Sequence, residues 1–347
     1  MVTDTKLINS NEALISAHEV LTADCKDLRS SLYKDLVVNA LKCKRDELDI
    51  LDLKVISRAL SEFRHAAHAF KPYRNIRKVS MFGSARVTPD STYYQAAVKL
   101  GQLAAEEGYM VITGGAEGIM RAGIEGAGPE KSFGVNIQLP FEQEANKIIQ
   151  KDPKSISFKY FFIRKVFFVM EADAVALFPG GFGTHDEGFE VLTLLQTGKA
   201  PPMPVILIES PGDNYWEEWD RFIRLQLLSR QLISNEDLSF YTIVNSPEQA
   251  RNYIKFYYST YHSLRQVKNT LVLRLEKELQ DDQIIELNQK FADLVEWGEI
   301  KKTLPLAEEV DEPDLLNKPR ISFMYNKKSA GRLNEMILAI NKMGMEN

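Results

Sequence analysis

Short, almost entirely apolar segments recur through the middle of the chain, and between them lie longer stretches with apolar residues every three or four positions. The apolar segments predict β-strands at residues 79–83, 109–113, 133–139, 174–178, 204–209 and 240–244. The intervening stretches predict helices, among them residues 93–107, 158–171 and 216–232. Strands without a polar face that alternate with helices are typical of a parallel sheet covered on both sides. We therefore predict a doubly wound, Rossmann-like α/β domain over residues 76–265, with its ligand at the carboxyl ends of the strands.

The segment before this domain has a different pattern. Residues 1–75 contain no strand-like run. One part of the segment has apolar residues at the spacing of an amphipathic helix, namely Leu53, Ile56, Leu60, Phe63 and Ala67. Pro72 is expected to end that helix, because proline lacks the N–H that a helix interior needs. We predict a helical extension that packs on the main domain or on a second subunit.

The segment after the domain mixes both patterns. Strands are predicted near residues 271–275, 299–304 and 321–325, with helices near residues 281–295 and at the end of the chain. An acidic connector that begins at Pro305 interrupts this pattern. Residues 266–347 are therefore predicted to form a small α+β unit, for which the sequence indicates no function.

Composition narrows the class of protein. The chain has 347 residues, of which 44% are hydrophobic and 26% charged, and its formal net charge is −5. This balance predicts no nucleic-acid or membrane partner. Cys25 and Cys43 have no histidine at ligand spacing, so neither a disulfide framework nor a metal site is predicted. The sequence has no signal-peptide pattern and no run of ~18 apolar residues, and we expect a cytoplasmic protein.

Three predicted strand-to-helix turns are rich in small residues. They read Phe82-Gly-Ser-Ala-Arg86, Thr113-Gly-Gly-Ala-Glu-Gly-Ile-Met120 and Pro179-Gly-Gly-Phe-Gly-Thr184. Any one of them is explained by a tight connector. Together, at one edge of a sheet, they indicate an anion site, because glycines admit a ligand and the following helices present unsatisfied N–H groups. None of the turns matches a P-loop or a dinucleotide fingerprint, so a mononucleotide or sugar phosphate fits better than NAD.

Two cations interrupt an otherwise apolar predicted helix. Lys165 has two equally plausible interpretations, a site residue or a surface cation paired with Glu171 or Asp173. Arg164 is the stronger candidate, because a guanidinium within an apolar helix needs a carboxylate or phosphate partner.

The stretch Pro179-Gly-Gly-Phe-Gly-Thr-His-Asp-Glu187 also has two interpretations. Thr184 and Glu187 have the spacing of a helix capping box, which would explain both residues without any catalysis. Alternatively, Glu187 is a catalytic carboxylate, with Glu190 on the same helix face. His185 stays outside the predicted chemistry, because a lone histidine in a turn is usually solvated.

The same four motifs resemble those of the LONELY GUY (LOG) phosphoribohydrolases, long described as lysine decarboxylase-like proteins. The third glycine turn matches the family signature PGGxGTxxE, Arg164 and Lys165 stand where the family has its Arg-Lys pair, and the first two glycine turns match as well. The resemblance covers roughly residues 76–235. It implies a Rossmann-like fold, a homodimer or larger homo-oligomer, and hydrolysis of the N-glycosidic bond of a nucleoside 5′-monophosphate to free base and ribose 5-phosphate.

The resemblance also implies roles for individual residues. Arg164 and Glu187 would be the catalytic pair. The remaining substrate-binding positions would be Ser84, Gly114, Gly115, Lys165, Gly180, Gly181, Gly183, Thr184 and Glu190. The sequence departs from the family pattern at three positions. Ala116 replaces a usual third glycine, and the alanine would narrow the pocket if that position needs positive φ. His185 and Asp186 replace a common Leu-Glu pair.

We therefore predict a phosphoribohydrolase that acts on an AMP-like or cytokinin nucleotide and requires no metal or redox cofactor. A nucleotide-binding regulatory protein with little or no catalysis is the main alternative. A lysine decarboxylase that uses pyridoxal phosphate is a third interpretation, although no lysine lies in an obvious Schiff-base setting.

Overall fold

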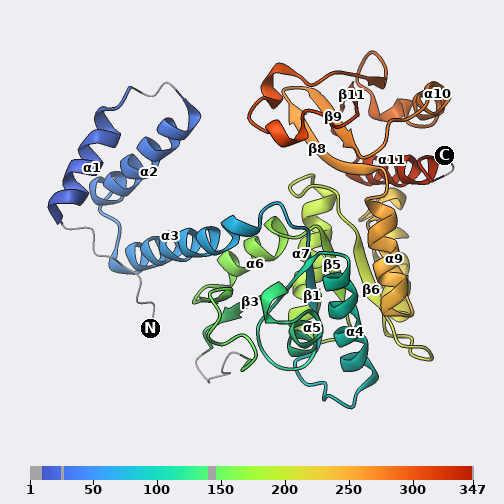
Figure 1. Cartoon of the computed structure of the whole chain (residues 1–347), viewed down its shortest axis with the longest axis horizontal. Coiled ribbons are helices and arrows are strands. Elements are labelled where there is room, and N and C mark those ends of the chain that lie inside the picture. Colours follow the sequence, from blue (N-terminus) through green and yellow to red (C-terminus); the bar gives the residue numbers. More distant parts are fainter. Residues whose placement is uncertain (1–9, 25–26, 140–145, 346–347) are drawn as a thin grey trace. The chain divides into compact units, whose positions relative to one another are not determined.

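The computed structural model describes residues 10–24, 27–139 and 146–345. A seven-stranded sheet forms its α/β domain, with the strand order β4-β3-β2-β1-β5-β6-β7 and every pair parallel (Figure 1). The strands are β1 (Lys78–Phe82), β2 (Met110–Thr113), β3 (Ser132–Ile137), β4 (Ser155–Phe158), β5 (Ala174–Leu177), β6 (Val205–Ile208) and β7 (Tyr241–Val244). The order reverses between β1 and β5, and the prediction of a doubly wound, Rossmann-like fold is confirmed.

All six strands predicted for this domain are present, but the sequence did not predict β4. Its residues Ser155, Ile156, Ser157 and Phe158 alternate polar and apolar side chains at the edge of the sheet. Phe158 was assigned to a helix, whereas α6 begins only at Phe161 and ends at Met170. The predicted helix at 216–232 is also shorter, because α8 (Tyr215–Phe222) continues as a π-helical turn at Ile223–Leu228.

Helices cover both faces of the sheet (Figure 1). On one face, α4 (Thr92–Glu106), α5 (Ile119–Ala127) and α9 (Pro247–Tyr257) form a common core with the strands. On the other face lie α6 and α7 (Phe182–Gln196). The Phe82 and Phe168 rings pack there with centroids 4.7 Å apart, and the Ser80 hydroxyl donates to the Phe168 carbonyl. This packing holds α6 against β1, the strand beside the reversal point.

The N-terminal helices are α1 (Ser10–Thr22), α2 (Leu28–Arg45) and α3 (Ile50–Phe70). The predicted amphipathic helix is α3, and a 3₁₀ turn that contains Pro72 follows it. At the end of α3, the Phe70 ring stacks on Phe133 and Phe167, at centroid distances of 4.0 and 5.8 Å. Among the helices that the structure describes, none is long and apolar enough to cross a membrane.

A second, antiparallel sheet lies in the C-terminal part, with the strand order β10-β11-β9-β8. Its strands are β8 (Tyr261–Val267), β9 (Thr270–Leu275), β10 (Lys301–Lys302) and β11 (Arg320–Met324), and its helices are α10 (Asp281–Lys290) and α11 (Ala330–Met343). The sequence did not predict β8, which is largely polar. Asn341 of α11 is buried; its amide accepts from the N–H groups of Thr260 and Tyr261 and donates to the Tyr257 carbonyl. The second sheet is thereby joined to the end of α9.

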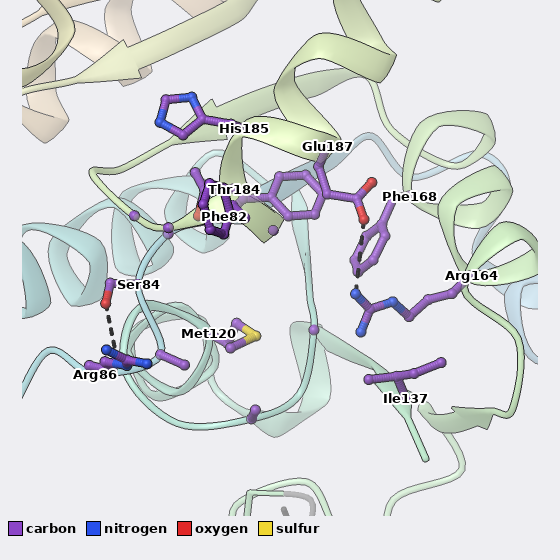
Figure 2. A pocket seen from close by; sticks show the side chains of 18 of the residues that line it. Phe82, Ser84, Arg86, Met120, Ile137, Arg164, Phe168, Thr184, His185 and Glu187 are labelled. Carbon is purple, nitrogen blue, oxygen red and sulfur yellow. Dashed lines mark hydrogen bonds and ion pairs between the residues drawn. The ribbon is translucent and has the colours of Figure 1, made fainter. Parts of the chain in front are cut away.

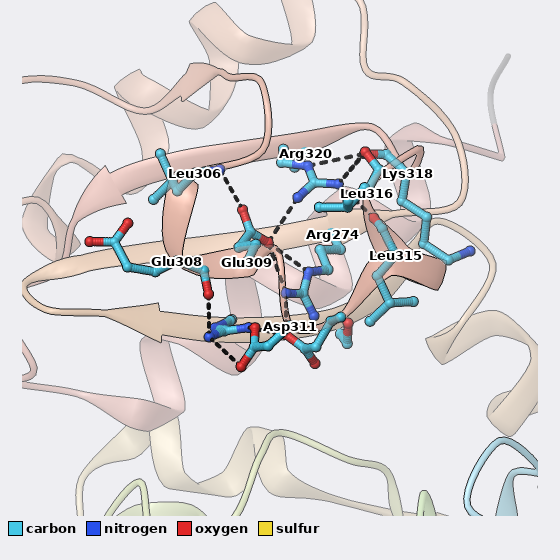
Figure 3. Close-up of polar contacts among 12 residues, drawn as sticks. Arg274, Leu306, Glu308, Glu309, Asp311, Leu315, Leu316, Lys318 and Arg320 are labelled. Atoms are coloured by element: carbon cyan, nitrogen blue, oxygen red, sulfur yellow. Dashed lines mark hydrogen bonds and ion pairs between the residues drawn. The ribbon is translucent and has the colours of Figure 1, made fainter. Parts of the chain in front are cut away.

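The acidic connector folds onto this second sheet through one buried carboxylate (Figure 3). Glu309 is fully buried, and its Oε1 accepts from the guanidinium groups of Arg274 and Arg320, at 2.8 Å for the closest nitrogen of each. Its Oε2 accepts from the Leu306 N–H at 2.9 Å. The connector therefore supplies the counter-charge for two buried arginines of β9 and β11.

Candidate functional site

The three glycine turns meet at the reversal point of the parallel sheet. The Ser84 N–H donates to the Pro179 carbonyl at 3.1 Å, which joins the turns after β1 and β5. The Ile119 N–H donates to the Ser84 carbonyl at 3.0 Å, which joins the second turn to the first. Backbone contacts therefore hold the three turns in one arrangement, at the sheet edge where ligands bind in this class of fold.

A cavity of about 780 Å³ lies between these turns (Figure 2). Most of the predicted site residues line it, namely Ser84, Gly114, Arg164, Gly180, Gly181, Gly183, Thr184 and Glu187. The lining does not include Gly115, Lys165 and Glu190. Residues that sequence reasoning did not select also line it, among them Arg86, Met120, Asn136, Ile137, Phe168 and His185.

At two positions of the turns, neighbouring atoms lie so close to the backbone that only glycine fits. A Cβ added to Gly180 would lie 2.1 Å from the Thr184 hydroxyl. Gly115 has φ +71°, and an added Cβ would lie 2.2 Å from Asn136 Oδ1. Ala116 is not among the described residues with positive φ, so the alanine causes no backbone strain there. The family departure at Ala116 is thus compatible with the turn.

The first turn of α7 has the character of an anion site. Gly181 precedes the helix as its N-cap, and no side chain caps it. Within the described part of the chain, the N–H groups of Gly181, Phe182 and Gly183 donate to no protein acceptor. All three residues line the cavity. Unsatisfied N–H groups together with the positive end of a helix dipole favour a bound anion such as phosphate.

The capping-box interpretation of Thr184 and Glu187 is wrong. The helix starts at Phe182, so both residues lie inside it, and both are buried. Glu187 follows Thr184 by three residues and is therefore on nearly the same face, one turn deeper. The carboxylate is thus available to the cavity instead of the backbone.

Glu187 and Arg164 point toward each other across the cavity wall (Figure 2). Glu187 is 3% exposed, and its Oε1 lies 3.9 Å from Arg164 Nη2, within ion-pair range but beyond hydrogen-bond length. Burial raises the pKa of Glu187 to about 7, although Lys165 and Arg164 oppose the shift. Burial also lowers the pKa of Arg164 from its usual value. Since neither the Glu187 Oε2 nor the Arg164 Nε has a hydrogen-bond partner among the described residues, both groups keep bonding capacity for a ligand.

Lys165 lies beside the carboxylate of Glu187 and does not line the cavity itself. Its Nζ lies 2.6 Å from Glu190, 2.9 Å from Asp186 and 3.8 Å from Glu187 Oε2. The alternative pairing with Glu171 or Asp173 is wrong, because both of those carboxylates face Lys78 instead. We place Lys165 and Glu190 beside the cavity, where they act on Glu187.

Two cavity features escaped the sequence analysis. Asn136 lies under the second turn, where its amide donates to the Gly134 carbonyl and to Ser155 of the unpredicted strand β4. His185 was expected to be solvated, but it is half-buried, and its Nε2 lies 2.7 Å from the Tyr215 hydroxyl. The Asn136–Ser155 and His185–Tyr215 contacts have no local sequence signal, because they join residues 19 and 30 positions apart in the chain.

The structure is a doubly wound, Rossmann-like α/β fold with a cavity at the sheet edge where ligands bind in this class of fold. Residues 115–254 match the family described as "Possible lysine decarboxylase". This match agrees with the resemblance of the chain's motifs to the LOG proteins. The matched segment contains the second glycine turn from Gly115 onward, the whole third glycine turn, Arg164 and Glu187.

Several solved structures are similar to part of the chain. The molybdenum cofactor binding protein from the phototrophic bacterium Rippkaea orientalis is 28% identical with a TM-score of 0.34, over 52% of this chain and 94% of that chain. The molybdenum cofactor carrier protein from Chlamydomonas reinhardtii is 18% identical with a TM-score of 0.35, over 52% and 96%. DNA processing protein A from Helicobacter pylori is 17% identical with a TM-score of 0.36, over 51% and 79%. No curated protein matches the sequence.

Proposed function

We propose that the protein hydrolyses the N-glycosidic bond of a nucleoside 5′-monophosphate and releases the free base and ribose 5-phosphate. One observation carries the proposal: a buried carboxylate, Glu187, lies one helical turn beyond an uncapped helix N-terminus on the same cavity. The Glu187 carboxylate suits a ribose that develops positive charge, and the uncapped helix N-terminus suits the 5′-phosphate.

The phosphate end of the proposed site is the third glycine turn. The N–H groups of Gly181, Phe182 and Gly183 and the hydroxyl of Thr184 would bind the phosphate oxygens, with Ser84 and Gly114 on the facing turns. A helix dipole contributes at most about 2 kcal/mol to such binding, so several N–H donors must act together. The phosphate does not react, and its binding energy positions the ribose.

The sugar end is Glu187 with Arg164. Cleavage of the bond between C1′ and the base nitrogen develops oxocarbenium character on the ribose, which a carboxylate stabilises. Water adds its hydroxyl to C1′, and the departing base takes up a proton. With a pKa of about 7, Glu187 can accept the proton of the attacking water near neutral pH. Arg164 would hold the carboxylate in place or contact the leaving group, and Lys165 and Glu190 would support it.

Lysine decarboxylation, which the family description suggests, would use pyridoxal phosphate bound to a lysine as a Schiff base. Among the described residues, no lysine lines the cavity. Lys165 is the nearest to the proposed catalytic pair, and Asp186 and Glu190 hold its ammonium group. The residues therefore do not fit that cofactor.

We also propose that the enzyme acts in the cytoplasm as a homodimer or larger homo-oligomer. Exposed apolar side chains on α6 support an assembly, since Phe162, Val166 and Met170 are 54%, 41% and 51% exposed at a spacing of four residues. Light scattering coupled to size exclusion would measure the assembly size. A monomer at micromolar concentration would contradict this part of the proposal.

A substrate panel tests the reaction. The purified protein is incubated with AMP, GMP and CMP, and bases and sugar phosphates are separated by chromatography. We expect free base and ribose 5-phosphate in equal amounts from at least one nucleotide. Tight nucleotide binding by calorimetry without base release would favour the alternative of a regulatory nucleotide-binding protein.

A further inference from the structure

We propose that His185 is a positioning residue, which fixes the phosphate-binding turn through the hydroxyl of Tyr215 and the carbonyl of Gly180. We name these three residues the Gly180 clamp. The inference rests on the proposed function of the turn as a phosphate site. It gives a function to His185, for which the sequence analysis predicted none.

The direction of the protons in the Gly180 clamp follows from its hydrogen bonds. The Tyr215 hydroxyl donates to the Gly180 carbonyl at 2.6 Å, and the same oxygen lies 2.7 Å from His185 Nε2. A carbonyl oxygen can only accept, and a phenol has a single proton, so that proton is on the Gly180 side. His185 must therefore donate from Nε2, as it can both in the Nε2–H tautomer and as imidazolium.

The Gly180 clamp is anchored to rigid parts of the domain. Tyr215 is the first residue of α8. Its neighbour Trp216 is buried, and the backbone N–H of Trp216 donates to the Glu209 carboxylate at 2.6 Å. The His185 and Tyr215 rings lie within 24° of parallel at a centroid distance of 5.9 Å. His185 itself belongs to α7. The clamp thus connects the turn after β5 to two helices.

The turn needs such an anchor because two glycines flank the peptide bond between positions 180 and 181. Glycine rotates readily about φ and ψ, so this peptide plane is unusually free to turn over. In a trans peptide, C=O and N–H point in opposite directions. Holding the Gly180 carbonyl on Tyr215 therefore directs the Gly181 N–H away from Tyr215, as a donor without a protein partner. A rotated peptide would instead present a carbonyl oxygen where the site requires a donor for phosphate.

The test measures binding of ribose 5-phosphate by calorimetry to the full-length protein, with ribose as the phosphate-free control. His185→Leu removes the Nε2 donor, and Tyr215→Phe removes the hydroxyl with little change of shape. His185→Gln keeps an N–H donor at about the distance of Nε2. We expect each of the first two variants to weaken ribose 5-phosphate binding about tenfold, since one hydrogen bond is lost. The His185→Gln variant should come within about threefold of the wild type.

Kinetics with the nucleotide give a second readout. The His185→Leu and Tyr215→Phe variants should raise KM for the nucleotide more than they lower kcat, because the clamp acts on the phosphate and not on the reacting bond. The double variant should be no weaker than either single variant, because both substitutions break the same connection. These changes should occur without a matching loss of thermal stability.

Several outcomes would overturn the inference: unchanged ribose 5-phosphate binding in both variants, failure of glutamine to restore it, or an equal loss of ribose binding. A wild-type protein that binds no ribose 5-phosphate overturns it as well. If the wild type binds ribose 5-phosphate but releases no base from any nucleotide, the proposed reaction is wrong. The binding data on the variants then still test the role of the Gly180 clamp.

Discussion

The carboxylate of Glu187 lies in a wall of the cavity, where burial raises its pKa and two cations, Lys165 and Arg164, lower it. Burial is the larger effect and raises its pKa to about 7. In the proposed reaction the ionised form is the active one. We therefore expect kcat/KM for the nucleotide to rise with pH through about 7 and to level off above it, because kcat/KM reports ionisations of the free enzyme. Initial rates of base release from pH 5 to 9 measure this. A profile that is flat between pH 6 and 8 would contradict the assignment.

The same pKa shift predicts an effect on stability. The folded-state pKa lies above the unfolded value, so the folded protein binds the proton more tightly, and stability from this group is lost as pH rises through about 7. Glu187→Gln should therefore raise the free energy of unfolding at pH 8 by about 2 kcal/mol and much less at pH 5. Urea unfolding at both pH values measures the difference.

Glu190→Gln is the matched control for that experiment. Glu190 is on the same helix, but its carboxylate accepts from Lys165 at 2.6 Å. Its replacement should lower stability at pH 8, the opposite sign to Glu187→Gln. Equal effects of the two substitutions would show that Glu187 is not held in an unfavourable charged state.

At the scale of elements, the second glycine turn offers a test of its geometry. Gly115→Ala requires positive φ for alanine and places a Cβ 2.2 Å from Asn136 Oδ1. Gly198 also has positive φ, but an added Cβ there meets nothing within 4 Å. Gly198→Ala therefore measures the backbone cost alone, about 1 kcal/mol. Gly115→Ala should cost about 1–3 kcal/mol more in urea unfolding. Equal costs would mean that Asn136 moves aside freely.

Periodicity predicted the elements with a regular apolar pattern. The six strands that form the middle of the parallel sheet and one of its edges are nearly all apolar. The apolar spacing also predicted α3, although four residues of its stripe are exposed, namely Leu53, Ile56, Leu60 and Phe63. Strand β4 is short and lies at the other edge, and β8 is largely polar, so neither has the pattern of a buried strand. The start of α7 at Phe182 had no clear sequence signal, because glycine is a poor helix former. Here Gly183 lies inside the first turn.

The candidate site was predictable where its residues are local in sequence. The glycine turns, Arg164 and Glu187 follow predicted strands or lie on predicted helices, so their convergence follows from parallel topology. The partners of these residues were not predictable. Lys165 meets Glu190 and Asp186 across two helices, and His185 meets Tyr215 across 30 residues. Such contacts depend on how whole elements pack.

At the scale of the whole molecule, the C-terminal unit depends on the carboxylate of Glu309. Removal of that group by Glu309→Ala leaves Arg274 and Arg320 buried without their shared acceptor. Arg274 keeps a second carboxylate, Glu312, at 2.6 Å, whereas Arg320 keeps backbone carbonyl acceptors. We therefore expect a loss of about 3 kcal/mol in the free energy of unfolding, the lower end of the cost of breaking a buried ion pair. Glu308→Ala, one residue away, removes an exposed ion pair with Lys268 and should change little. Urea unfolding of both variants checks this, and a stable Glu309→Ala protein would contradict it.

The measurement that tests the central claim most directly is ribose 5-phosphate release from AMP by the wild type and by Glu187→Gln, with nucleotide binding of both measured by calorimetry. If GMP or CMP proves to be the better substrate in the panel, that nucleotide replaces AMP. The account predicts equal amounts of base and ribose 5-phosphate from the wild type. It predicts that the glutamine variant still binds the nucleotide but turns over at least about 100-fold more slowly, the loss typical of one electrostatic catalytic group. Full turnover by Glu187→Gln, or a wild type that binds nucleotides and releases neither product, would contradict it.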